Sequence, residues 1–207
     1  LPRKSLIEAR EVRLFTGHTG DINCVCLSAD RRYALSGSND ETLKLWETES
    51  GECLRTFKGE SGRICSVSLS ADGSWAISGG DSGIRVWDVG SGRCLRIFQG
   101  DNYQVRSVYL SADGHLALSG SDYDKTIKLW EVDSGRCLRT LEGHLAGVHS
   151  VCLSADDRFA LSGSADKTLK LWEVASGHCL STLRGHAAGV SAICLNANGR
   201  NALSSSH

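Results

Sequence analysis

Short runs of apolar residues, separated by clusters of turn-forming residues, follow one another along the whole chain. The run T-L-K-L-W-E at 168–173 alternates apolar and polar side chains, whereas V-C-L at 151–153 is apolar throughout. Alternation is typical of a strand with one covered face, and the continuous run of a strand covered on both faces. In this part of the chain, Ala-Asp-Asp, Ala-Asp-Lys and Ala-Ser-Gly separate the runs. We therefore predict four short strands, at about 148–154, 158–163, 168–173 and 178–183.

The same pattern returns about every 42 residues. Four tryptophans lie 41, 43 and 42 residues apart: Trp46, Trp87, Trp130 and Trp172. Five glycines keep the same period: Gly17, Gly59, Gly100, Gly143 and Gly185. An L-S-A-D segment, or the related L-N-A-N, follows each of these glycines. Self-similarity at this period predicts an architecture of stacked repeats, each a unit of four short strands.

Composition and charge narrow the function classes. The chain has 207 residues, of which 41% are hydrophobic and 23% charged, as expected of one soluble domain. Its net charge is -1 and its lysines and arginines are scattered, so we expect no nucleic-acid partner. No apolar run approaches the roughly 20 residues that span a bilayer, so we expect no membrane partner. The single proline beside 23 glycines favours strands joined by tight turns.

The nine cysteines recur at fixed places in the units. Four of them stand in S-G-x-C-L segments: Cys53, Cys94, Cys137 and Cys179. Three others stand in apolar V/I-C-L runs: Cys26, Cys152 and Cys194. We predict small buried side chains in a reducing compartment, hence the cytoplasm, with the nucleus as the alternative. No cysteine pair has a partner pair at zinc spacing, so we expect no metal and no cofactor.

These motifs together resemble the WD40 family of β-propellers. Each unit has G-H or a variant of it, then S-G-S-x-D-x-T, then W-D or W-E, over the chain from about residue 10 to 207. The resemblance implies an all-β propeller of four-stranded antiparallel blades around a central channel. It places units at 17–57, 59–98, 100–141 and 143–183, a partial fifth at 185–207, a preceding outer strand at 11–15 and a linker at 1–9.

Ser, His and Asp within one unit also suggest a hydrolase's catalytic set. The resemblance instead implies that they join the Trp in a structural hydrogen-bonded tetrad. Two units supply complete sets: His18, Ser36, Asp40 and Trp46, and His144, Ser162, Asp166 and Trp172. The sets repeat at a spacing of 126 residues, whereas a catalytic site is needed once. The nucleophile motif G-x-S-x-G is absent from the sequence. We therefore predict no catalytic residue and no enzyme activity.

The second and third units depart from the motif. Glu60 and Asp101 stand where the His is expected, and the turn after the second strand is one residue shorter and one longer, respectively. Two interpretations stay open. These units have drifted at dispensable positions, or this edge of the molecule has been remodelled for binding.

The resemblance also places a partner-binding rim. One set of positions follows the first Val or Ile of each unit: Asn23, Cys65, Arg106, His149 and Ser191. A second set precedes the turn Asp: Asn39, Gly80, Tyr123 and Ala165. From these and their neighbours we predict partner contacts at Arg63, Tyr103, Arg106, Tyr123, His149 and Asn23. Tyr and Arg are enriched in interface hot spots, and an Arg pair suits an acidic or phosphorylated peptide. The alternative is that these are ordinary solvated side chains.

The fifth unit offers two strands, near 190–195 and 201–205, without a Trp-bearing third. Three outcomes are open: an incomplete ring that is a fragment of a longer chain, an open arc that forms a homodimer through its ends, or a five-unit ring closed imperfectly. The predicted function is a non-catalytic scaffold for protein–protein interaction. The alternative is a C-terminal sensor or autoinhibitory propeller of a larger signalling ATPase, which a nucleotide-binding P-loop upstream of Leu1 would favour.

Overall fold

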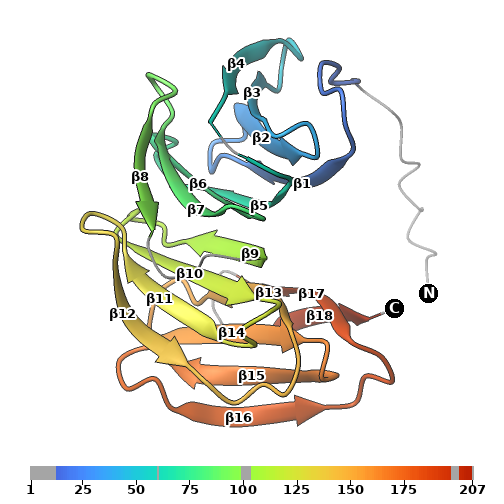
Figure 1. The fold of residues 1–207 in the computed structure, drawn as a ribbon, viewed down its shortest axis with the longest axis vertical. Coiled ribbons are helices and arrows are strands. Elements are labelled where there is room, and N and C mark those ends of the chain that lie inside the picture. Colours follow the sequence, from blue (N-terminus) through green and yellow to red (C-terminus); the bar gives the residue numbers. More distant parts are fainter. Residues whose placement is uncertain (1–12, 60, 99–103, 197–200, 207) are drawn as a thin grey trace, which may run out of the picture.

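The structure is a computed structural model that describes residues 13–59, 61–98, 104–196 and 201–206. Its regular elements are strands, which form four four-stranded sheets and one two-stranded sheet in an arc (Figure 1). Within each sheet, neighbours along the chain pair antiparallel. The architecture is therefore the predicted one: four complete blades and part of a fifth.

The strand bounds follow the repeat. Blade 1 contains β1 Ile22–Leu27, β2 Tyr33–Ser38, β3 Leu43–Glu47 and β4 Cys53–Phe57. Blade 2 contains β5 Ile64–Leu69, β6 Trp75–Gly80, β7 Gly83–Asp88 and β8 Cys94–Phe98. Blade 3 contains β9 Val105–Leu110, β10 Leu116–Ser121, β11 Ile127–Glu131 and β12 Arg136–Leu141. Blade 4 contains β13 Val148–Leu153, β14 Phe159–Ser164, β15 Thr168–Glu173 and β16 Cys179–Arg184, and blade 5 contains β17 Val190–Leu195 and β18 Ala202–Ser206.

The second strand of each complete blade packs closely on the first strand of the next blade. A glycine in the second strand makes this possible. A Cβ built on Gly120 would lie 2.8 Å from Val148 Cγ1, and one on Gly37 would lie 2.5 Å from Ile64 Cγ2. The same approach recurs at Gly79 and Gly163. In blade 5 the register places Ser205 at this position, opposite Ala192.

The two ends of the arc leave apolar side chains open to solvent. Ile22 and Val25 are 53% and 67% exposed, although their counterparts Val148 and Val151 are 0% and 4% exposed. At the other end, Leu203 is 75% exposed. The five-unit ring considered from the sequence is therefore wrong, because neither end face is covered by the other. A fragment of a longer chain and a dimerising arc stay predictions.

The outer strand expected at 11–15 lies partly outside the described residues. Residues 13–15, which are described, are not part of a strand. Phe15 nevertheless packs edge-on against Trp46, with ring centroids 5.8 Å apart, and Phe57 packs in the same way on Trp87. The segment before the first unit thus occupies the place that the fourth strand of a preceding blade takes elsewhere.

The prediction that the cysteines are buried is wrong for one of the two sets. Cys53, Cys94, Cys137 and Cys179 are exposed, because each lies in the fourth strand, at the outer edge of its blade. In the first strands, Cys152 is buried, Cys26 is partly buried and Cys194, at the open end, is exposed. Burial raises the pKa of Cys152 and of Cys26 to about 12, which keeps these thiols protonated and unreactive.

The packing of glycine against the next blade gives a first prediction. Gly120→Ser should lower the free energy of unfolding by about 1–3 kcal/mol, because the new side chain meets Val148 in a closely packed interface. Urea unfolding measures the change. Gly90→Ser is the matched control, since the nearest atom to its Cβ would be 3.7 Å away in an exposed turn. Equal stability of the two variants would contradict the packing argument.

Candidate functional site

The two predicted tetrads are brought together in the first and fourth blades. In blade 4, the Trp172 indole N–H donates to Ser162 Oγ at 2.8 Å, and Ser162 Oγ lies 2.7 Å from His144 Nε2. His144 Nδ1 lies 2.8 Å from Asp166 Oδ2. Blade 1 repeats the chain with the same three distances, from Trp46 through Ser36 and His18 to Asp40. A threonine extends each tetrad, since Thr168 Oγ1 and Thr42 Oγ1 donate to the carboxylates at 2.6 Å.

The hydrogen bonds assign the protons of the blade 4 tetrad. Ser162 accepts from the indole and therefore donates to His144 Nε2, which requires a neutral imidazole that donates through Nδ1 to Asp166. Burial lowers the pKa of His144, although Asp166 opposes this effect. Burial alone would raise the pKa of Asp166, but hydrogen bonds from Thr168, the Leu145 backbone N–H and His144 lower it to about 2.

The tetrads are enclosed in the blades. The side chain of His144 is 0% exposed and that of Asp166 is 7% exposed. Ser162 is 1% exposed, and its hydroxyl is occupied by the indole and the imidazole. A nucleophile must reach its substrate, and this hydroxyl reaches none. The arrangement instead fixes the third strand to the second strand and to the loop that enters the blade.

Blades 2 and 3 keep the indole bond. Trp87 donates to Ser78 Oγ and Trp130 to Ser119 Oγ, each at 2.9 Å. Glu60 and Asp101, which replace the His in the sequence, lie outside the described residues. Asp81 does not take the tetrad place that its sequence position indicates. The shorter turn moves this residue to the rim of the arc, where it accepts a hydrogen bond from Arg63 Nε at 3.1 Å.

The first strands lie side by side at the inside of the arc, and each contains a β-bulge at the same place (Figure 1). In β9, Val105 pairs with Ser121 and Ser107 with Gly120, so that Arg106 is the extra residue. The same irregularity makes extra residues of four others: Asn23, Cys65, His149 and Ser191. A bulge redirects a side chain out of the alternating pattern. These are the positions predicted from the sequence, and the bulge is the reason that they converge.

These five residues and Arg63 line one cavity of about 460 Å³, which we name the inner mouth. Arg106 Nε lies 3.2 Å from Asp122 Oδ2, and His149 Nε2 lies 3.5 Å from the other oxygen of the same carboxylate. Both arginine side chains are 39% exposed. The predicted arginine pair is therefore present, but each guanidinium already has an Asp beside it.

The turn after the second strand supplies the outer wall of the mouth. The backbone N–H groups of Asn39, Asp81, Asp122 and Ala165 each donate to the residue before the first strand, so these four are equivalent. The sequence prediction had placed Gly80 and Tyr123 there instead of Asp81 and Asp122. It was wrong at both because the two turns differ in length. Tyr123 lies one residue further along and is 74% exposed. Tyr103 lies outside the described residues.

Asn23 shows how the mouth is held together across two blades. Its Nδ2 donates to Asn39 Oδ1 at 2.8 Å and to the backbone oxygen of Ile64 at 2.9 Å. The second bond joins blade 1 to blade 2. At the far end, Ser191 Oγ lies 3.1 Å from Ser205 Oγ. The mouth therefore has fixed amide and hydroxyl groups at its ends and charged groups between them.

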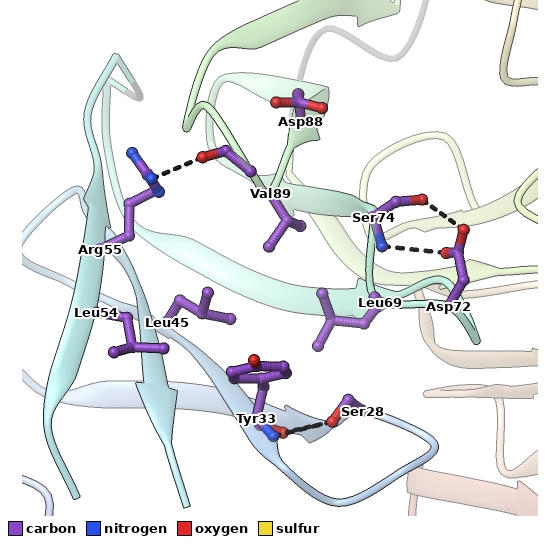
Figure 2. A pocket seen from close by; sticks show the side chains of 12 residues that line it. Ser28, Tyr33, Leu45, Leu54, Arg55, Leu69, Asp72, Ser74, Asp88 and Val89 are labelled. Carbon is purple, nitrogen blue, oxygen red and sulfur yellow. Dashed lines mark hydrogen bonds between the residues drawn. The ribbon is translucent and has the colours of Figure 1, made fainter.

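A second cavity of about 420 Å³ lies between blades 1 and 2, on the outer side of the sheets (Figure 2). Figure 2 shows Tyr33, Leu45 and Leu69 along its apolar walls. Arg55 crosses from blade 1 and donates to the backbone oxygens of Gly90 and Ser91. Arg96 donates in the same way to Ser134 between blades 2 and 3. This recurrence indicates that the arginine joins neighbouring blades, so the cavity is a less specific candidate than the inner mouth.

The described residues hold no cluster of three or more His, Cys, Asp or Glu side chains arranged to bind a metal ion.

The described part of the chain contains no helix of the length and apolarity needed to cross a membrane.

Comparison with known proteins identifies the repeat. The family model described as "WD domain, G-beta repeat" matches residues 9–47, 51–88, 92–131, 135–173 and 177–207. WD repeat-containing protein 18 from Bos taurus is 43% identical over 49 residues, which cover 24% of this chain and 11% of that protein. The small ribosomal subunit protein RACK1 from Schizosaccharomyces pombe is 49% identical over 41 residues, 20% of this chain and 13% of its own.

A third relative is the ribosome biogenesis protein BOP1 homolog from Anopheles gambiae, 40% identical over 43 residues. That match covers 21% of this chain and 5% of the relative. Each of the three matches is about as long as one repeat. The chain spans about a tenth of the length of the curated relatives that it matches. The similarity therefore belongs to the repeat and not to a whole protein.

The tetrad gives a second prediction. Ser162→Ala leaves the Trp172 indole N–H and the His144 nitrogen without their buried partner, which should lower the free energy of unfolding by about 1–3 kcal/mol. Urea unfolding followed by circular dichroism measures this loss. Ser61→Ala, in an exposed loop, is the control and should leave stability within about 0.5 kcal/mol of the wild type. A loss no larger than that of the control would show that the tetrad does not stabilise the blade.

The pKa values give a third prediction. The folded protein holds His144 neutral below its usual pKa of 6.5, so the unfolded chain binds the extra proton as pH falls below that value. Stability should therefore decrease from pH 7.5 to pH 5.5, and the lowered pKa of Asp166 should extend the loss below pH 4. Urea midpoints at the two pH values, at constant slope, measure the effect. His144→Gln should reduce the difference, whereas His115→Gln, an exposed histidine, should keep it. An unchanged difference in His144→Gln would refute the assignment.

Proposed function

The chain belongs to the WD40 repeat family, and from this premise we propose that it is a non-catalytic scaffold that docks partner peptides at the inner mouth. WD40 domains generally bind other proteins and are generally not enzymes. The observation that supports the site is the convergence of five bulge residues on one cavity of about 460 Å³. A side chain that breaks the strand pattern at the same place in every blade is available for contact and is not needed for the core.

The proposed partner segment is acidic or phosphorylated. Arg63 and Arg106 use Nε for Asp81 and Asp122, while their remaining guanidinium nitrogens have no hydrogen-bond partner among the described residues. A carboxylate or phosphate accepts two such donors at once. Ion pairs between groups this exposed contribute only about 0–1 kcal/mol, so a ligand can rearrange them at small cost. Asp122, between Arg106 and His149, would repel an acidic group placed off centre and so restricts its position.

We place this scaffold inside the cell, in the cytoplasm or alternatively the nucleus, because nine free thiols suit a reducing compartment. The relatives named for ribosomes or ribosome biogenesis match over one repeat each, which gives no ground for assigning their partners to this chain. The alternative of a sensor propeller within a larger signalling ATPase stays a prediction of the sequence. Homodimerisation through the open ends of the arc likewise stays a prediction.

A fourth prediction tests the mouth. A fluorescein-labelled peptide with one phosphoserine flanked by glutamates should bind, and Arg106→Ala should weaken binding about tenfold or more, because charge-assisted hydrogen bonds are lost. Fluorescence anisotropy measures the Kd. Arg136→Ala removes an exposed arginine from the outer strand β12 and should leave the Kd unchanged. Equal weakening by both variants would show attraction by net charge alone, and no binding to the wild type would refute the acidic ligand.

A further inference from the structure

The fifth blade ends on an open strand edge. Among the described residues, β18 is hydrogen-bonded to β17 on one side only. In the complete blades the equivalent strands, β2, β6, β10 and β14, pair on their second side with the strand that carries the tryptophan. The edge of β18 therefore presents the backbone groups that bind such a third strand elsewhere in the molecule. Unpaired strand edges readily add a further strand.

Half of a tetrad is already assembled beside this edge. His186 Nε2 lies 2.7 Å from Ser204 Oγ, the same distance as between His144 and Ser162 in blade 4. By sequence spacing and register, Ser204 is the residue that would accept a hydrogen bond from an indole N–H. Its partner His186 has its Nδ1 without a hydrogen bond among the described residues. The missing members of this tetrad are an Asp and a Trp.

The space for the indole ring is also present. A Cβ built on Gly143 would lie 3.4 Å from Trp172 Cη2, and one on Gly17 would lie 3.3 Å from Trp46 Cη2. At Gly185, which has the same backbone conformation with φ 153°, the built Cβ has no atom within 4 Å. The ring that contacts this glycine in blades 1 and 4 thus has its place open in blade 5.

Two leucines beside the edge are more exposed than their counterparts. Leu203 is 75% exposed, whereas Leu161 in blade 4 is 2% exposed. Leu183, at the end of β16, is 48% exposed, whereas Leu141 at the end of β12 is 2% exposed and belongs to the same apolar cluster as Trp172. A strand bearing a tryptophan would cover both leucines, and burial of this apolar area would favour its binding.

We propose that this edge site, formed by Gly185, His186, Leu203 and Ser204, binds a tryptophan-bearing strand of the D-x-T-L-K-L-W-E type carried by a separate polypeptide. The strand pairs antiparallel with β18 in the register of β15 on β14, in which Trp172 lies opposite Ala160 and Lys170 opposite Ser162. Its indole N–H donates to Ser204 Oγ, and its Asp accepts from His186 Nδ1. Its tryptophan ring covers Gly185.

A second copy of this chain does not supply that strand. Each of the tryptophan-bearing strands β3, β7, β11 and β15 is already paired on both edges within its own blade. Releasing one would break a complete blade to finish an incomplete one. The partner is therefore a different polypeptide with a free strand of this chemistry.

The test uses the protein and a peptide with the sequence of residues 166–173, D-K-T-L-K-L-W-E, labelled with fluorescein. Anisotropy should show saturable one-to-one binding. Replacing the peptide's Trp by Ala should weaken binding at least tenfold, because both the indole bond and the ring contact are lost. This comparison needs no protein variant, so it does not depend on whether a variant folds.

Protein variants then place the peptide on the edge. Ser204→Ala removes the indole acceptor and should also weaken binding at least tenfold, whereas Ser61→Ala should bind as the wild type does. Equal binding of the Trp and Ala peptides, or equal binding by Ser204→Ala, would overturn the proposal, as would no binding. Mass measurement in solution separates the remaining case: a stable dimer that the peptide does not dissociate would show that a second copy covers the edge, and this also overturns it.

Discussion

The buried indole N–H of one tryptophan in each complete blade is the group on which the arrangement of the blade depends. It can only donate, so burial obliges the fold to supply an acceptor. All four complete blades use the serine of the second strand, at 2.8 or 2.9 Å. This bond fixes the second and third strands to each other at the middle of the sheet. In blades 1 and 4, His and Asp extend it to the entry loop and the turn.

The inner mouth is arranged by the same sheets. Because the second strand of each blade is held firmly, the first strand accommodates its extra residue as a bulge at the open inner end. Blades 2 and 3 place arginines and carboxylates there, where blade 1 has Asn23 and Asn39 and blade 5 has Ser191. The two blades that depart from the histidine motif are thus the two that carry the Arg–Asp pairs of the mouth. This coincidence fits remodelling for binding better than drift.

The repeat made most of the fold predictable from the sequence. Trp172 and Ser162 could be assigned as partners because the same residue types recur at the same spacing in blade 1. The bulges could not be foreseen, because they depend on the register between two strands and not on either strand alone. The place of Asp81 depended on the length of a turn by one residue. The exposure of Val25 depended on a neighbouring blade, since Val151, in the same local sequence position, is buried.

Ser205 gives the series of blades a direction. In blades 1 to 4 a glycine at this register admits the first strand of the following blade, and a Cβ there would come within 2.5–2.8 Å of that strand's side chains. The Cβ of Ser205 fills this gap. A sixth blade of the same kind would meet it with a steric clash, whereas the Ile22 and Val25 face has the shape that fits against a glycine-bearing strand. Growth of such an array by duplication of repeats is therefore easier at its leading face than at its trailing one.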